Sequence, residues 1–228
     1  MTAIGWLPAA WLRLMPRDEG HQRVPLAIPK LPWRRSSAWL LGAIFGSQSI
    51  LFYGCITWLA SIYEERGWRL AAAGGLIALL TGIGLIATLA VPLLADRFGS
   101  RRSQLALASL LSIAGILGIA LTPGEQPGSI LTIGSTALLG LGIGAYFPLA
   151  LTLPVDVASD SADAASISAL MLLIGYLLAA IAPVALGLIR DATGNFGAVM
   201  WSLVVIAFAM LPLALALSPG RLRRAGAT

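Results

Sequence analysis

Six long segments without any Asp, Glu, Lys, Arg or His dominate this 228-residue sequence. A helix needs about 20 mostly apolar residues to cross the hydrocarbon core of a bilayer, and each segment is that long. The composition agrees, because 58% of the residues are hydrophobic and 11% charged, which a water-soluble domain could not accommodate without an apolar surface. We therefore predict an all-α integral membrane protein with six transmembrane helices, at approximately residues 37–63, 70–95, 103–122, 129–155, 164–189 and 196–217.

The residues before the first segment divide into two parts. Residues 1–14 are apolar for only about a dozen positions, too few to span a bilayer, and they lack the basic start of a secretory signal. We interpret them as the end of a preceding helix. Residues 13–35 contain six Lys/Arg and four prolines and are interpreted as a cytoplasmic linker. The predicted organisation is a helix end with a linker, a six-helix bundle and a basic tail, at residues 1–36, 37–217 and 218–228.

Lys and Arg residues are unevenly distributed between the two sides of the segments. Twelve of the 15 lie in the linker, in the turn after the second segment and in the C-terminal tail, and the others are Arg66, Arg69 and Arg190. Because basic loops stay in the cytoplasm, we predict a protein of the inner (plasma) membrane with both chain ends cytoplasmic. Asp163 lies in an acidic turn on the same side and is predicted to be the N-cap of the fifth helix.

A charged turn of residues 92–102, here called the gate loop, joins the second and third segments. Asp96 can cap a helix end or pair with a cation, and Gly99 permits a left-handed turn. The arginines of the loop can anchor it at an anionic membrane surface, and they are Arg97, Arg101 and Arg102. The loop resembles the D-R-x-G-x-R-R turn of major facilitator transporters. This resemblance implies that the gate loop latches two six-helix halves together in one state of a transport cycle.

An internal repeat accompanies the gate loop. Residues 93–100 and 188–195 share the pattern L-[LI]-x-D-x-x-G-[SN] at an offset of 95 residues. Three predicted spans separate the two turns, which therefore lie on opposite membrane faces, as expected for two three-helix units of inverted topology. The alternative is two ordinary helix-ending turns that both use Asp and Gly.

Several motifs together resemble the C-terminal half of the cyanate and nitroimidazole transporter group in the same superfamily. The resemblance covers nearly the whole chain and rests on the order and spacing of GSQSILFY at 46–53, LLADR at 93–97, YFPLAL at 146–151 and GYLLAA at 175–180. It implies one half of a twelve-helix fold that moves a solute by alternating access. The segment before Gly175 lacks the glutamine expected in that group, which leaves the solute open.

Polar and aromatic residues within the spans are candidates for lining a solute cavity. Gln48 is the most polar side chain in any span, and an amide in hydrocarbon needs a partner, either another helix or a solute. Tyr176 could equally face a cavity or pack between helices. The predicted cavity residues are Gln48, Phe52, Tyr53, Phe147 and Tyr176.

Other residues in and near the spans are predicted to have structural roles. Gly140 and Gly144 are four residues apart, which lets a second helix approach closely. Cys55 is expected to be a packed thiol, and His21 has no second metal ligand near it in the sequence. Tryptophans near span ends commonly anchor helices at the membrane interface, and here they are Trp33, Trp39, Trp58 and Trp68.

We predict a secondary transporter half for a small polar or anionic solute, with a cyanate-like ion as one candidate. No span contains a carboxylate, histidine or basic residue, so a proton relay or a countercharge for an anion would come from elsewhere. The expected partners are the solute, the bilayer, and a missing N-terminal six-helix half or a second copy. No enzymatic activity, cofactor, metal or nucleic acid is expected. The alternatives are a non-transporting membrane assembly or regulatory subunit, and a half-size transporter that acts as a dimer.

Overall fold

The computed structural model describes residues 31–94, 100–122 and 128–217. The described residues form six helices and no strand, and each helix is long and apolar enough to cross a membrane. This confirms the predicted all-α membrane fold, with helix ends within a few residues of those expected. The helices are α2 Ser36–Glu65, α3 Leu70–Leu94, α4 Arg101–Leu121, α5 Ile130–Val157, α6 Ser161–Thr193 and α7 Gly197–Ala216.

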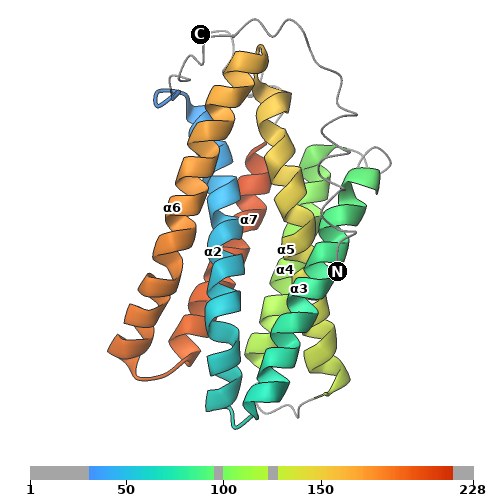
Figure 1. The fold of residues 1–228 in the computed structure, drawn as a ribbon, viewed down its shortest axis with the longest axis vertical. Helices are drawn as coiled ribbons and strands as arrows, with labels where there is room; N and C mark the ends of the chain where they lie inside the picture. The colour runs from blue at the N-terminus through green and yellow to red at the C-terminus, as the bar shows by residue number, and fades with distance from the viewer. Residues whose placement is uncertain (1–30, 95–99, 123–127, 218–228) are drawn as a thin grey trace, which may run out of the picture.

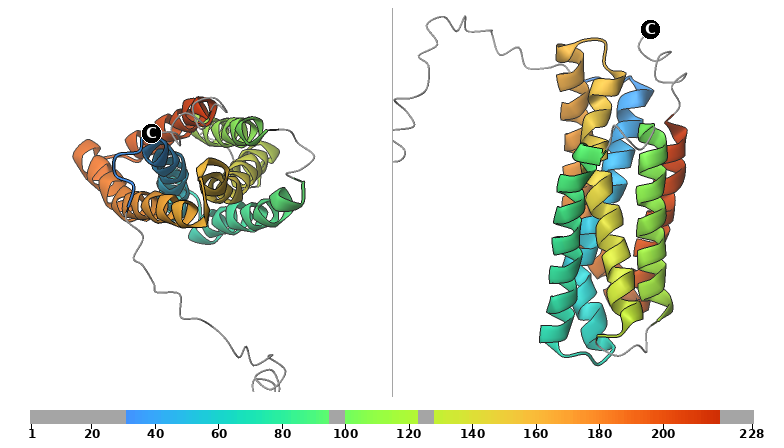
Figure 2. Two further views of the ribbon diagram at one scale, coloured as in Figure 1. Left: turned by 90° about the horizontal axis from the view of Figure 1, so that it is seen from above. Right: turned by 90° about the vertical axis from the view of Figure 1, so that its right-hand side faces the viewer.

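Two helices form the centre of the bundle. In Figures 1 and 2, α2 and α5 lie side by side in the middle, with α6 and α7 around α2 and with α3 and α4 around α5. Both central helices bury most of their apolar length inside the protein, whereas α3 and α6 bury much less. This leaves long apolar faces of α3 and α6 exposed, as a membrane protein requires.

The bundle consists of two three-helix units that run in opposite directions. Figure 1 shows α2 descending and α5, the first helix of the second unit, ascending. The packing is reciprocal, because α2 packs along α6 and α5 packs along α3. The 95-residue offset of the sequence repeat relates individual contacts as well: Phe45 lies against Gly175, and Leu80 against Gly140. At this offset Phe45 corresponds to Gly140 and Leu80 to Gly175, so the large and the small residue have changed places between the two contacts. This correspondence supports inverted repeats rather than two unrelated turns.

Helices α3 and α5 touch through their backbones. A Cβ atom on Gly140 would lie 2.6 Å from the Leu80 carbonyl oxygen, and one on Gly144 would lie 2.7 Å from the Gly84 carbonyl carbon. Real Cβ atoms do not approach other atoms so closely, so only glycine allows this crossing. The predicted packing role of Gly140 and Gly144 is therefore confirmed.

The helix ends correct one prediction. The N-cap of α6 is Asp160, whose side chain accepts a hydrogen bond from the backbone N–H of Asp163. Asp163 was expected at that position, but it lies in the first turn, where it accepts from the Ser159 N–H and pairs with Arg35. The acidic turn holds two well-placed carboxylates three residues apart, and spacing alone could not distinguish the cap from its partner.

Ion pairs connect helices at the end of the bundle where α2 begins. Arg35 precedes α2 and pairs with Asp163 of α6, and Arg101 Nε of α4 lies 3.6 Å from Asp156 Oδ2 of α5. The side chains of Arg101 and Asp156 are 36% and 42% exposed. Such a solvated pair contributes only about 0 to 1 kcal/mol, so it orients the helix ends more than it stabilises the fold.

Two consecutive charges close the opposite end of the bundle. Glu65 Oε2 accepts a hydrogen bond from the Phe196 N–H just before α7, and Arg66 donates to the Ile119 carbonyl near the end of α4. Each charge thus meets a helix end of opposite partial charge. The guanidinium group also lies 5.2 Å from the centre of the Tyr63 ring. Burial lowers the pKa of Arg66 from its ordinary value, and the neighbouring Tyr63 and Glu65 oppose that shift.

Candidate solute cavity

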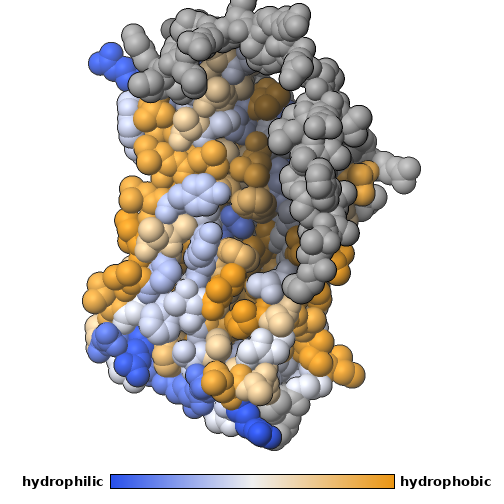
Figure 3. Space-filling model, in the orientation of Figure 1, coloured by the Kyte–Doolittle hydropathy of each residue, from blue (hydrophilic) through white to orange (hydrophobic). Residues whose placement is uncertain are grey.

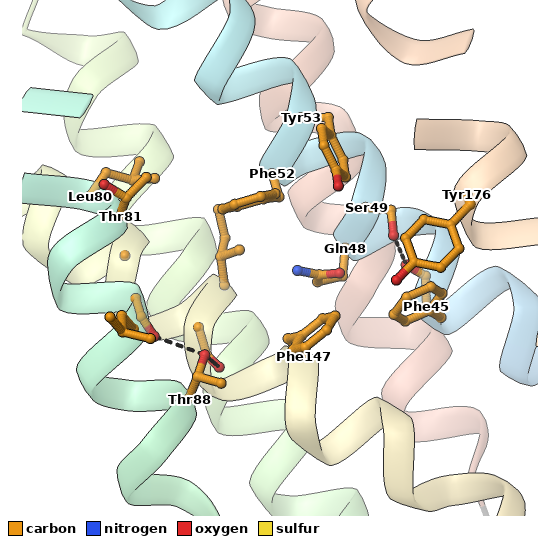
Figure 4. A pocket seen from close by; sticks show the side chains of 15 residues that line it. Phe45, Gln48, Ser49, Phe52, Tyr53, Leu80, Thr81, Thr88, Phe147 and Tyr176 are labelled. Atoms are coloured by element: carbon orange, nitrogen blue, oxygen red, sulfur yellow. Dashed lines mark hydrogen bonds between the residues drawn. The ribbon is translucent and has the colours of Figure 1, made fainter. Parts of the chain in front are cut away.

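A cavity of about 350 Å³ opens between α2, α3, α5 and α6. All five residues predicted to line a cavity lie on its wall, together with residues of α3 that the sequence had not indicated (Figure 4). In Figure 3, residues of intermediate or polar character gather along the middle of this otherwise apolar face. The cavity lining includes Phe45, Gln48, Ser49, Phe52, Tyr53, Thr81, Gly84, Thr88, Gly144, Phe147 and Tyr176.

Gln48 is the buried polar group of the cavity. Its residue is 4% exposed and lies near the middle of α2, which corresponds to the middle of the membrane if α2 spans it. No side chain or backbone group in the described part of the chain makes a hydrogen bond to it. Figure 4 shows its amide pointing into the space between α2 and α3. An interhelical hydrogen bond, one of the two roles expected for Gln48, is therefore absent within the described residues.

Aromatic rings form the α2, α5 and α6 side of the cavity. The Phe45 ring centre lies 6.0 Å from that of Phe147 and 5.7 Å from that of Tyr176, the latter edge to face. Phe52 and Tyr53 form a second edge-to-face pair at 5.3 Å. Ring faces and edges favour planar guests, because offset and edge-to-face stacking are the preferred aromatic arrangements.

The two tyrosines stand at the open side of the cavity. Tyr53 is 39% exposed and Tyr176 52% exposed, so neither residue is enclosed by the described part of the chain. The two possibilities left open for Tyr176 are resolved in part, because its ring both packs on Phe45 and borders the cavity. That any of these residues contacts a solute stays a prediction.

Helix α3 supplies hydroxyl groups that the sequence did not predict. Thr81 Oγ1 lies 2.8 Å from the Ile77 carbonyl oxygen and 3.2 Å from that of Ala78, both in its own helix. Thr88 Oγ1 lies 2.9 Å from the carbonyl oxygen of Gly84 in α3 and 2.9 Å from that of Gly144 in α5. Pro148 is the signal in the sequence: it lacks an N–H, so the carbonyl four residues earlier, that of Gly144, has no helical donor.

The cavity wall is uncharged. Its lining consists of amide, hydroxyl, aromatic and aliphatic groups, and no Asp, Glu, Lys, Arg or His is among the described residues that line it. Such a wall can orient a small polar or aromatic molecule by hydrogen bonds and stacking. The described lining residues offer no countercharge to an anion.

The gate loop is described only at its two ends, residues 92–94 and 100–102. Asp96, Arg97 and Gly99 lie outside the described residues, so their predicted roles stay predictions. Arg101 and Arg102 form the first turn of α4 behind the N-cap Ser100, and Arg101 reaches Asp156. These residues lie at one end of the bundle, away from Gln48 in the middle of α2.

Comparisons with known proteins agree with this architecture. The chain is 33% identical to the 2-nitroimidazole transporter of Escherichia coli K12 over 185 residues, which are 81% of this chain and 44% of that protein. It is 32% identical to the cyanate transport protein CynX of the same organism over 187 residues, 82% of this chain and 47% of that protein. It is also 32% identical to the uncharacterised transporter YycB of Bacillus subtilis over 192 residues, 84% of this chain and 45% of that protein.

The chain thus spans less than half the length of each of these three relatives. A family model described as the Major Facilitator Superfamily matches residues 1–183, which is most of the chain. The match confirms the family inferred from the gate loop and the apolar motifs, and the six helices fit one half of that fold. The chain belongs to the major facilitator superfamily.

Proposed function

We propose that this chain is one six-helix half of a secondary transporter and that its solute binds against Gln48. The observation that supports this most is a buried amide with no hydrogen-bond partner among the described residues, directed into a cavity at mid-helix. Such an amide is costly unless something bonds to it, and a polar solute would supply the missing partner. Transporters of this fold place their sites at this depth.

The proposed solute is small, planar and polar. The cavity of about 350 Å³ lies at the lower end of the usual range for small-molecule sites, and its aromatic wall suits a flat guest. The relatives named for 2-nitroimidazole and cyanate suggest these two compounds as probes. The uncharged wall favours the neutral heterocycle, since a cyanate ion would need a countercharge from outside the described residues.

We further propose that a second six-helix half, or a second copy, covers the open side of the cavity. Tyr53 and Tyr176 border that side and are too exposed to enclose a solute alone. The proposed cycle alternates access to the cavity by rocking the two halves. The gate loop would latch them in one state, as its resemblance to the superfamily turn implies.

Replacing Gln48 with alanine is expected to lower uptake of 2-nitroimidazole about tenfold, because one hydrogen bond to the solute is worth roughly that factor. Uptake would be measured in membrane vesicles that contain the assembled transporter, with protein amounts matched by immunoblot. Ser47→Ala is the control, since Ser47 is also buried in α2, donates to the Ile44 carbonyl and does not line the cavity. Wild-type uptake by Gln48→Ala would leave Gln48 as a packing residue and remove the main support for the proposal.

The proposed orientation has its own test. We expect the linker around Arg34 and the tail around Arg223 to be cytoplasmic, because twelve of 15 basic residues lie on that side. Alkaline phosphatase, which is active only after export, and green fluorescent protein, which is fluorescent in the cytoplasm, would each be fused after Thr228. Fluorescence without phosphatase activity is the expected result, and the reverse would overturn the orientation.

A further inference from the structure

The cavity has a corner where hydrogen-bond acceptors outnumber donors, here called the acceptor corner: the carbonyl oxygens of Gly84 and Gly144 and the hydroxyl of Thr88. All three residues line the cavity. The Thr88 oxygen lies 2.9 Å from each carbonyl oxygen, and a hydroxyl has only one proton. The two carbonyls therefore compete for a single side-chain donor.

The two carbonyls are not equivalent. Gly84 lies within α3, where its carbonyl also receives the backbone N–H of the residue four positions later. The carbonyl of Gly144 would receive the N–H of residue 148, but residue 148 is a proline. When the cavity is empty, the Gly144 carbonyl therefore depends on the Thr88 hydroxyl for a hydrogen-bond donor. This hydrogen bond joins α3 to α5 at the point where glycines bring the two backbones into contact.

We infer that the Gly144 carbonyl is the acceptor for a donor group of the solute, and that the Thr88 hydroxyl occupies this carbonyl until the solute arrives. This deepens the proposed function and rests on it. Both carbonyl oxygens lie at the same distance from Thr88 Oγ1. The hydroxyl proton can therefore turn from Gly144 to Gly84 while the Thr88 oxygen stays in place. A solute N–H or O–H can then take the Gly144 carbonyl, and no group is left without a partner.

A second observation points to a ligand at the same place. Gln48 is 4% exposed, has no hydrogen-bond partner in the described part of the chain, and lies across the cavity from Thr88 in Figure 4. A flat solute between α2 and α3 would meet an amide on one side and the acceptor corner on the other. The site therefore selects an uncharged polar solute with at least one N–H or O–H donor over an anion without one.

The test uses two compounds that differ in one donor. 2-Nitroimidazole has a ring N–H, and 1-methyl-2-nitroimidazole has a methyl group in its place. Their dissociation constants would be measured by calorimetry on the purified assembled transporter in lipid nanodiscs, at mildly acidic pH so that the ring keeps its proton. We expect wild type to bind the N–H compound about tenfold more tightly.

Two variants are expected to change this preference in opposite directions. Pro148→Ala restores a backbone N–H that bonds the Gly144 carbonyl, which makes this oxygen a weaker acceptor for a further donor, so the preference should fall to within about twofold. Thr88→Val removes the competing hydroxyl and leaves that carbonyl without a donor, so the preference should rise severalfold above that of wild type. A side chain that only holds the helices together would not produce opposite shifts.

Thr81→Val is the matched control, because Thr81 lines the cavity from the same helix but bonds only carbonyls of α3. It should keep the wild-type preference. Equal binding of both compounds by wild type would overturn the inference, and so would an unchanged preference in Pro148→Ala or a reduced one in Thr88→Val. Failure of wild type to bind either compound would overturn the proposed solute class itself, and the inference with it. Melting temperatures without ligand separate these outcomes from misfolding, and Thr88→Val keeps the test available if Pro148→Ala does not fold.

Discussion

Gly144→Ala is expected to lower the melting temperature of the purified protein by about 3 to 10 °C. The new methyl group would lie 2.7 Å from the Gly84 carbonyl carbon, which is backbone and cannot rotate away. The helices must separate, at a cost of about 1 to 3 kcal/mol for an overpacked contact, and in a chain of this size each kcal/mol corresponds to about 2 to 4 °C. The measurement is thermal unfolding in detergent, followed by the fluorescence of the native tryptophans.

Gly134 provides the control on the same helix. A Cβ atom there would meet nothing within 4 Å. Alanine favours helix over glycine by about 1 kcal/mol, so Gly134→Ala should keep or slightly raise the melting temperature. If both variants had the melting temperature of wild type, the inference of a tight crossing between α3 and α5 would be wrong. A loss in Gly144→Ala alone would support it.

The helices were predictable because a bilayer requires long apolar segments, and such segments can be recognised from the local sequence alone. An apolar run without charges has few structural options, and all six such runs are helices. The Gly140 and Gly144 pair was predictable for a similar reason, since small residues four apart form a flat helical surface. The partner at that surface was not predictable, because Gly84 lies about 60 residues earlier and nothing in the sequence relates the two.

The cavity was predicted in part. Gln48 could be recognised because an amide is rare in an apolar span, and the aromatic residues came from the resemblance to a transporter group. The contribution of α3 was missed, since a threonine in a helix usually bonds its own backbone, as Thr81 does. Thr88 also reaches the Gly144 carbonyl of α5, and this contact cannot be inferred from the sequence of α3 alone.

Two tryptophans make contacts within the bundle that their positions near span ends did not indicate. Trp68 was expected to anchor a helix end at the membrane interface, but it is only 8% exposed and packs on Tyr63, with ring centres 4.5 Å apart. Trp58 donates its Nε1–H to the Pro183 carbonyl of α6, 3.0 Å away. Position near a span end predicts an interface only when no other helix covers the residue, and the sequence does not say which residues are covered.

The Arg66 contact is the other place where a single change should have a large effect. Arg66→Glu is expected to destabilise the protein by about 2 to 4 kcal/mol. The guanidinium group donates to the Ile119 carbonyl at 3.1 Å, near the end of α4 where the helix dipole is negative. A carboxylate there loses this charged hydrogen bond and the contact with the Tyr63 ring, and it repels the carbonyl end of α4. The same thermal unfolding measurement should show a melting temperature lower by about 5 to 15 °C.

Arg69→Glu separates this contact from a general effect of charge. Arg69 lies three residues later in the same loop and is exposed, and no hydrogen bond or ion pair of its side chain is seen among the described residues. The two variants have the same net charge and the same change of residue type, so electrostatic effects on the whole protein or on its detergent cancel between them. Arg69→Glu should melt within about 2 °C of wild type, because an exposed charge away from a partner changes stability by about 0.5 kcal/mol or less. Equal losses in both variants would mean that the loop responds to charge as such, and that the hydrogen bond to Ile119 does not hold the end of α4 against α2.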